Sequence, residues 1–154
     1  MTSLKFISTV EVPLEYLIKI FTDYEKFSNY LPRQIKNIKI IESNNDLTTT
    51  EESIVLSSVV KNTIHQQSVH QQISNNELFS KIISGPAKDT TINLKLKKNG
   101  TKTEINVDVE MKLSLKAKFL EPIIKLWYKR VINAILYTIS NEFSQSQNNS
   151  NGKM

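Results

Sequence analysis

The feature that most constrains the fold is an unbroken alternation of apolar and polar side chains over residues 101–115. Its apolar positions are Ile105, Val107, Val109, Met111, Leu113 and Leu115. Successive side chains of a strand point to opposite faces, so this pattern predicts a long strand with one buried and one wet face. From about Phe119 to Phe143 the apolar spacing becomes that of a long amphipathic helix. A half-wet strand followed by such a helix favours a curved sheet wrapped around the helix.

Length and composition fit one globular domain. A chain of 154 residues can bury roughly 70% of the surface that its unfolded form exposes. No apolar run approaches the ~20 residues needed to span a bilayer, and the first residues alternate like a strand rather than forming an export leader. The chain has no cysteine, which excludes disulfides and cysteine metal sites. We therefore expect a cytoplasmic protein.

The charge of the chain is moderately basic. A net charge of +5 favours weak attraction to anionic surfaces, but the lysines are scattered, so we expect no specific nucleic-acid partner. Lys118, Lys125 and Lys129 lie near one line on the predicted helix. They form either a solvated face or a peripheral contact with an anionic membrane. The oligomeric state does not follow from the sequence.

Turn signals at a steady spacing predict an antiparallel meander. They lie at Asn44-Asn45-Asp46, Lys61-Asn62, Asn75-Asn76, Gly85-Pro86 and Asn99-Gly100. A two-residue loop at Asn99-Gly100 pairs Leu94 with Ile105. Apolar positions of both strands then fall on one face.

The faces of the earlier strands depend on the hairpin at Asn75-Asn76. Pairing Ile73 with Leu78 there turns His65, Gln67 and Gln71 toward the concave face of the sheet. A bulge near Gly85-Pro86 would swap these faces. Which face of the earlier strands lines the interior is therefore left open.

The element order completes the prediction. Two short helices follow Pro13, and further strands are expected near 34–42, 47–57 and 63–73. The order is thus strand, two short helices, six strands and a long carboxy-terminal helix. A second segment of interest follows the first helix and reads Asp23-Tyr24-Glu25-Lys26-Phe27-Ser28-Asn29-Tyr30-Leu31-Pro32.

This order and this segment resemble the START-like (SRPBCC) helix-grip superfamily, and most closely its polyketide cyclase/dehydrase and coenzyme Q-binding branch. Ser84-Gly85-Pro86-Ala87-Lys88 and Gly100-Thr101 also resemble hairpin positions of that branch. The resemblance covers residues 3–143. It implies an α+β helix-grip fold, in which a seven-stranded antiparallel sheet wraps around a long carboxy-terminal helix, with two short helices after strand 1 and an apolar cavity. We expect one domain over 1–143 and a disordered polar tail over 144–154.

The expected ligand-binding residues surround that cavity. Trp127 lies at the centre of the apolar helix face, and its indole N–H needs a partner when buried. The full predicted set comprises Tyr24, Leu31, His65, Gln67, Leu94, Met111, Leu115, Ile123, Trp127 and Val131. The alternative is ordinary core packing for Trp127 and a structural role for His65. His70 is expected on the surface.

Several kinds of chemistry are excluded or disfavoured. Three glycines are too few for a phosphate-binding loop. His65 and His70 are five residues apart in a predicted strand and point to opposite faces, so we expect no metal site and no cofactor. The predicted inner face offers no paired carboxylates and no nucleophile–base pair, so no catalytic residue is assigned.

The favoured function is the binding or transport of a hydrophobic small molecule such as a lipid, an isoprenoid or a quinone. The first alternative is a cyclase- or dehydratase-type enzyme in which His65 or a tyrosine acts as the acid/base group. The second alternative is a ribosome-associated or other protein-interaction module. The sequence does not identify the ligand, and it leans against catalysis.

Overall fold

The computed structural model describes residues 2–31, 33–55 and 63–151, with side chains described as far as residue 148. Its elements are β1 (Thr2–Val10), α1 (Leu14–Phe21), α2 (Tyr24–Phe27), η1 (Ser28–Tyr30), β2 (Ile35–Asn44), β3 (Leu47–Val55), β4 (Thr63–Ser74), β5 (Glu77–Ser84), β6 (Thr91–Asn99), β7 (Lys102–Met111), η2 (Lys118–Leu120) and α3 (Glu121–Asn151).

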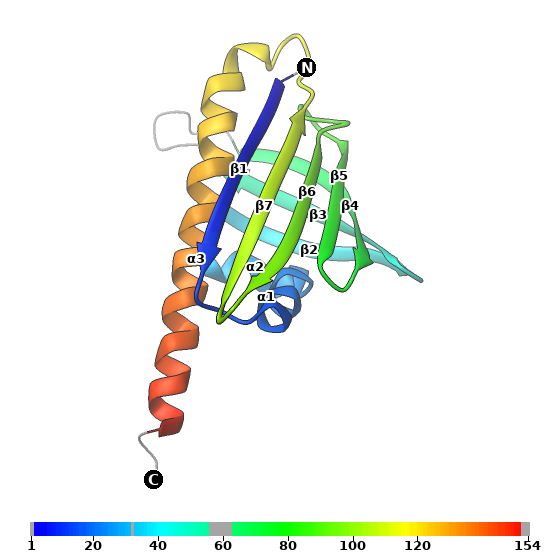
Figure 1. The fold of residues 1–154 in the computed structure, drawn as a ribbon. Coiled ribbons are helices and arrows are strands. Elements are labelled where there is room, and N and C mark those ends of the chain that lie inside the picture. The colour runs from blue at the N-terminus through cyan, green and yellow to red at the C-terminus, as the bar shows by residue number, and fades with distance from the viewer. Residues whose placement is uncertain (1, 32, 56–62, 152–154) are drawn as a thin grey trace.

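The strands form one antiparallel sheet of seven strands in the order β1-β7-β6-β5-β4-β3-β2. The sheet curves around α3, and α1 and α2 lie at one end of the curve (Figure 1). Every neighbouring pair is antiparallel. The predicted α+β helix-grip fold, with two short helices after the first strand, is confirmed.

The core lies between β7 and α3. The apolar inward side chains of β7 are Ile105, Val107, Val109 and Met111, and each is at most 2% exposed. They belong to the same buried cluster as Ile139 of α3. Full burial of such a side chain stabilises a fold by about 1.5–3 kcal/mol. The alternation found in the sequence therefore marks the side chains that β7 contributes to the core.

The last strand is shorter than predicted. β7 ends at Met111, and Leu115, expected to face Trp127 from the sheet, is 89% exposed instead. The chain leaves the sheet because the Ser114 N–H donates to the Pro86 carbonyl at 3.1 Å and the Ala117 N–H donates to the Ser114 carbonyl at 2.9 Å. These bonds close a turn that leads into η2 and α3.

The β6–β7 hairpin differs from the prediction by two residues. Its loop is Gly100-Thr101, because Asn99 pairs with Lys102, and Leu94 consequently pairs with Val107 rather than Ile105. Gly100 takes a φ of +65°, which glycine adopts without the steric cost that other residues meet. A shift of two residues leaves every side chain on its predicted face.

The β4–β5 hairpin differs by one residue, with the opposite consequence. Ser74 pairs with Glu77, but the next pair is Gln72 with Leu78, so Ile73 forms a bulge. A one-residue shift exchanges the two faces of a strand. The predicted inward orientation of His65, Gln67 and Gln71 is therefore wrong. The bulge that exchanges these faces lies at this hairpin, and a second register shift, between the pairs Gln67–Ser84 and Ser68–Ile82, lies next to Gly85-Pro86.

The helix α3 begins at Glu121 and continues through Asn151, beyond the predicted end at Phe143. Its buried side chains include Ile124, Trp127, Val131 and Ile135, as the apolar spacing predicts. The side chains from 144 to 148 are exposed. The division of the chain at residue 143 stays a prediction. Within the described ranges, no helix is both long enough and apolar enough to cross a membrane.

Candidate functional site

A cavity of about 190 Å³ lies between the concave face of the sheet, α2 and α3. Most of its lining is aliphatic or aromatic. These residues are Phe21, Tyr24, Phe27, Ile35, Ile38, Ile54, Leu78, Phe79, Ile92, Leu94, Trp127, Tyr128, Val131, Ile132 and Ile135. The polar lining residues are Glu52, Gln66, Ser68, His70 and Ser80.

The polar lining residues come from three neighbouring strands. Alternate positions of a strand share a face, so Glu52 of β3 points inward together with Ile54. The same rule brings Gln66, Ser68 and His70 of β4 to the cavity. Together with Thr50 of β3 and Ser80 of β5, these side chains form the polar wall: Thr50, Glu52, Gln66, Ser68, His70 and Ser80.

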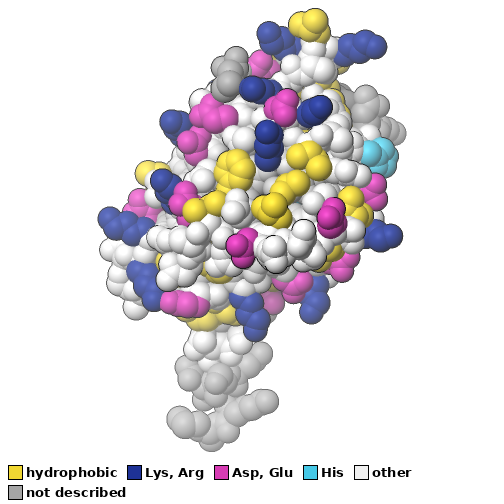
Figure 2. All heavy atoms as spheres, turned by 90° about the vertical axis from the view of Figure 1, so that its right-hand side faces the viewer, with side chains coloured by type: hydrophobic (Ala, Val, Ile, Leu, Met, Phe, Trp, Pro, Cys, Tyr) yellow, Lys and Arg dark blue, Asp and Glu magenta, His cyan; other side chains and the backbone are white. Residues whose placement is uncertain are grey.

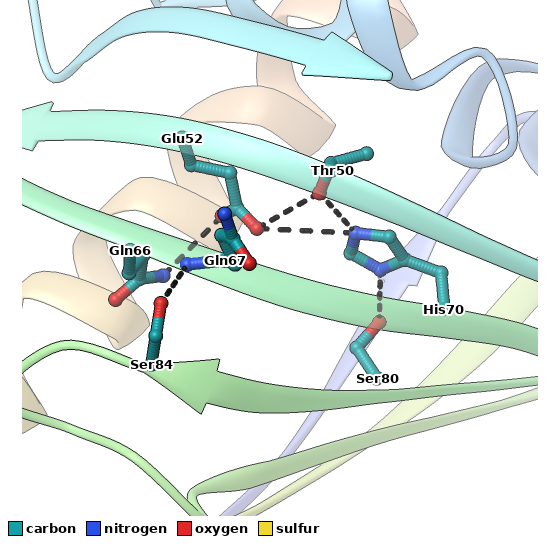
Figure 3. A network of polar contacts seen from close by, with 7 residues as sticks. All are labelled: Thr50, Glu52, Gln66, Gln67, His70, Ser80 and Ser84. Atoms are coloured by element: carbon teal, nitrogen blue, oxygen red, sulfur yellow. Dashed lines mark hydrogen bonds and ion pairs between the residues drawn. The ribbon is translucent and has the colours of Figure 1, made fainter. Parts of the chain in front are cut away.

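A chain of hydrogen bonds links the two titratable groups of the polar wall (Figure 3). The Ser80 Oγ lies 2.6 Å from His70 Nδ1, and His70 Nε2 lies 2.7 Å from Thr50 Oγ1. Thr50 Oγ1 in turn lies 3.0 Å from Glu52 Oε1. A hydroxyl can both donate and accept a hydrogen bond. The protonation state of Glu52 therefore decides which group donates and which accepts in each of these hydrogen bonds. With Glu52 ionised, Ser80 donates to His70, His70 to Thr50 and Thr50 to the carboxylate.

Burial sets the protonation of these groups. It lowers the pKa of His70 to about 4, so the imidazole is neutral at pH 7. Burial raises the pKa of Glu52, and hydrogen bonds from Ser68, Gln66 and Thr50 oppose that rise by stabilising the carboxylate. Burial and the nearby Glu52 both raise the pKa of Tyr128. None of the described lining residues is a lysine or an arginine.

Aromatic contacts hold the cavity walls in place. The ring of Tyr24 stacks on His70, with centroids 4.4 Å apart and planes 19° apart. The Trp127 Nε1–H donates to the Val55 carbonyl at 2.8 Å, which supplies the partner that a buried indole requires. Tyr128 packs edge-on against Trp127. These contacts join α2, α3 and the sheet around one space.

The structure brings together four of the predicted ligand-binding residues, namely Tyr24, Leu94, Trp127 and Val131, in the cavity lining. Met111 is buried in the core beside β1 and does not reach the cavity. Leu31 and Ile123 are half-buried and pack against the core. Leu115 is exposed outside the sheet. The ligand-binding role of each of these residues stays a prediction.

The two histidines have exchanged the places expected for them. His65 is exposed, and its Nδ1 lies 3.0 Å from the Ser53 Oγ on the outer face. Gln67 also lies off the cavity, and its N–H donates to the Ser84 Oγ at 2.9 Å. His70, expected on the surface, lines the cavity because of the bulge at Ile73.

Sequence reasoning missed Glu52, Gln66, Ser68 and His70. One signal was present for Glu52, which lies two residues before the buried Ile54 and so shares its face. The bulge at Ile73 could not be recognised from the pattern of polar and apolar residues. The described residues contain no group of three or more histidine or acidic side chains placed to hold one metal ion.

This chain is similar to known proteins in its three-dimensional structure but not at the level of sequence searches. No protein-family model matches the sequence, and no curated protein matches it. A protein of Thermus thermophilus superposes with a TM-score of 0.77 at 10% identity, over 94% of this chain and 99% of that one. A START superfamily protein from Mycobacterium smegmatis gives a TM-score of 0.74 at 14% identity, over 93% and 97%.

The Zhui aromatase/cyclase from Streptomyces sp. R1128 gives a TM-score of 0.72 at 10% identity, over 90% of this chain and 93% of that chain. Identities this low carry the fold and leave substrate and chemistry undetermined. The three superpositions cover 90% or more of this chain and 93% or more of each of those chains. The chain therefore has the START-like helix-grip fold.

Proposed function

We propose that this protein binds a compact apolar molecule in the cavity between the sheet and α3. The observation that carries the proposal is the cavity itself: about 190 Å³ of space with a mostly apolar lining and a polar wall on one side. Protein interiors are normally close-packed, and ligand pockets combine an apolar lining with a few convergent polar groups. The fold shared with a START superfamily protein and an aromatase/cyclase is consistent with this role.

The volume bounds the size of the ligand. An engineered apolar cavity of about 150 Å³ accepts benzene, whereas pockets for drug-sized ligands reach about 300–1,000 Å³. A cavity of about 190 Å³ therefore suits a molecule of one or two rings, or one end of a longer chain. A quinone with a long isoprenoid tail would leave most of that tail outside.

Filling the cavity tests the proposal. Val131 lines it and is 6% exposed, so the Val131→Phe side chain has to enter the free space. Leu126→Phe, on the same helix at a position that is 47% exposed, is the matched control. We expect wild type and L126F to bind indane in calorimetry and V131F to bind it at least tenfold more weakly. Equal binding by all three would contradict the proposal.

A second candidate is acid–base catalysis on a carbonyl compound, which the polar wall favours. His70 Nε2 and Glu52 Oε1 lie 3.9 Å apart and are joined through Thr50. Two buried groups with pKa values moved in opposite directions are typical of acid/base pairs. The probe is 2-indanone in deuterated water. Enzymatic exchange of its α-protons that is lost in His70→Gln and kept in His65→Gln would favour catalysis over binding alone.

Peripheral membrane contact, predicted from Lys118, Lys125 and Lys129, has one supporting observation. Leu115 and Phe119, in the segment between β7 and α3, are 89% and 76% exposed. Apolar side chains beside lysines suit an anionic lipid surface. Figure 2 shows a face on which both signs of charge are interspersed, with a hydrophobic side chain between Lys or Arg side chains at the upper tip of the molecule. Co-sedimentation with phosphatidylglycerol vesicles that is lost in the double variant Leu115→Ser/Phe119→Ser tests this proposal.

A further inference from the structure

Glu52 is the only acidic residue among the described residues that line the cavity, and none of those residues is a lysine or an arginine. Its side chain is 15% exposed, and so is that of His70, the nearest cationic candidate. His70 is neutral at pH 7 because burial lowers its pKa to about 4. When Glu52 is ionised, the cavity therefore holds a buried negative charge without a counter-ion.

The neighbours of Glu52 are arranged as donors to a carboxylate. Thr50 Oγ1 donates to Oε1 at 3.0 Å, and Gln66 Nε2 donates to Oε2 at 3.3 Å. The Ser68 hydroxyl also hydrogen-bonds the group and lowers its pKa. All three donors are neutral. A carboxylate accepts about four hydrogen bonds, so three protein donors leave about one position for a ligand.

A buried carboxylate is costly unless an opposite charge accompanies it. The apolar part of the lining supplies a second element of recognition, because Tyr24, Phe27 and Trp127 present aromatic rings to the same space. Aromatic faces attract cations, most strongly away from water. A molecule with a positive nitrogen and a small hydrocarbon body would satisfy both elements at once.

We infer that the cavity selects compact apolar amines, with the ligand's ammonium group donating to Glu52 and its ring system filling the space beside Trp127. This inference rests on the proposed binding function and names its ligand class. An acidic ligand of the same size would be repelled by Glu52. A neutral alcohol would leave the carboxylate without a counter-ion.

The groups that titrate around the site determine the pH dependence. Glu52 comes from β3, His70 from β4, Tyr24 from α2 and Tyr128 from α3, while the lining residues of β2, β5 and β6 do not titrate. Burial raises the pKa of both tyrosines, which therefore stay neutral. Between about pH 5 and pH 8 an ammonium ligand stays charged. The preference for the amine should therefore rise with pH as Glu52 ionises.

Matched probes on one ring system test this inference. Calorimetry at pH 7.5 compares 2-aminoindane, 2-indanol, indane and indane-2-carboxylate on the wild-type protein. We expect 2-aminoindane to bind roughly 10- to 100-fold more tightly than 2-indanol, because hydrogen bonds to charged groups are stronger by that factor. Glu52→Gln should abolish the preference. Glu51→Gln is the control, since Glu51 is the exposed neighbour on the outer face of the same strand, and it should keep the preference.

The outcomes separate the two proposals. Equal binding of 2-aminoindane and 2-indanol, or a preference that survives in E52Q, overturns the amine inference and leaves the cavity function standing. Binding of none of the four probes overturns both. If E52Q does not fold, the wild-type protein alone decides: the ratio of amine to alcohol affinity should rise with pH as Glu52 ionises. A flat ratio overturns the inference.

Discussion

The concave face of the sheet has two regions of opposite character, the apolar core strand β7 and the polar wall at the cavity. On β7 the inward side chains from Ile105 to Met111 are apolar and nearly inaccessible. On β4 the inward positions at the cavity are Gln66, Ser68 and His70. The β6–β7 pairing is regular throughout, whereas the β4–β5 pairing is interrupted by two register shifts.

The apolar side chains of β7 and the polar side chains of β4 contribute differently to the stability of the fold. Apolar burial on β7 stabilises the fold directly, while hydrogen bonds on β4 contribute only about 0.5–1.5 kcal/mol each after the loss of bonds to water. Glu52, with a pKa raised by burial, opposes folding when it is ionised. A polar wall of this kind adds little to stability.

The largest effect is expected on β7, in the apolar core. Ile105 is 1% exposed, and Ile105→Ala should lower the free energy of unfolding by about 2–5 kcal/mol through lost burial and the cavity left behind. Ile7→Ala on the outer face, at a position that is 61% exposed, should change it by less than about 0.5 kcal/mol. Denaturant unfolding measures both. Similar losses would contradict the assignment of the core face.

The next largest effect is a pH-dependent change in the free energy of unfolding, caused by His70 on the polar wall. His70 has a pKa of about 4 in the fold against 6.5 in a free histidine. Between these values the unfolded chain binds more protons, so His70 lowers stability as pH falls from about 6.5 to about 4. The full loss is about 3 kcal/mol. Above pH 6.5 this contribution is constant.

Two variants isolate the contribution of His70. Glu52 acts in the opposite sense, because a raised pKa makes the fold bind its proton more tightly as pH falls. The useful quantity is therefore the difference between wild type and variant in unfolding free energy over pH 4–6.5. His70→Gln should remove the loss due to His70, whereas His65→Gln on the exposed face should keep it. If both variants follow the wild-type curve, His70 is not the buried group that titrates.

A smaller effect concerns the turn that holds β5 against β4. Gly85 has a φ of +94°, and a Cβ there would lie 2.8 Å from the His65 carbonyl oxygen. Gly100 has a φ of +65° with no atom within 4 Å of the corresponding position. Gly85→Ala should cost about 2 kcal/mol or more, and Gly100→Ala about 1 kcal/mol. Thermal unfolding of both variants gives the comparison, and an equal cost would show that the contact with β4 is not limiting.

The contrast between β7 and β4 also explains which features the sequence could predict. Strict alternation on β7 marks one face as buried, and a two-residue error in its hairpin left Leu94 and Val107 on the correct side. The long helix and the short helices were predicted on the same basis, since apolar spacing differs between helix and strand. These elements determine the fold, and the fold could therefore be predicted from the sequence.

The residues of the candidate site could not be predicted from the sequence, and the reason is physical. β4 carries polar residues on both faces, such as Gln66 beside Gln67 and His70 beside Gln71. Without contrast between faces, the register rests on the hairpin alone, and the bulge at Ile73 reverses it. Residues gathered from β3, β4 and β5 become one site only after that register is set.

The smallest expected effect compares two Ser–His hydrogen bonds on opposite faces. Ser80 Oγ lies 2.6 Å from the inward His70, and Ser53 Oγ lies 3.0 Å from the exposed His65. Ser80→Ala leaves a buried ring nitrogen without its partner and should lower the free energy of unfolding by about 1 kcal/mol. Ser53→Ala should change it by less than about 0.5 kcal/mol, because water replaces the lost partner.

The same pair of variants has a spectroscopic readout. With Glu52 ionised, the Ser80 hydroxyl donates to Nδ1 of His70 and so favours the neutral imidazole. Removing it should raise the pKa of His70 from about 4, as followed by NMR titration of the ring protons. Ser53→Ala should leave the titration of His70 unchanged. A pKa of His70 that stays fixed in Ser80→Ala would mean that desolvation alone sets it and that the hydrogen-bonded chain does not control the proton on the polar wall.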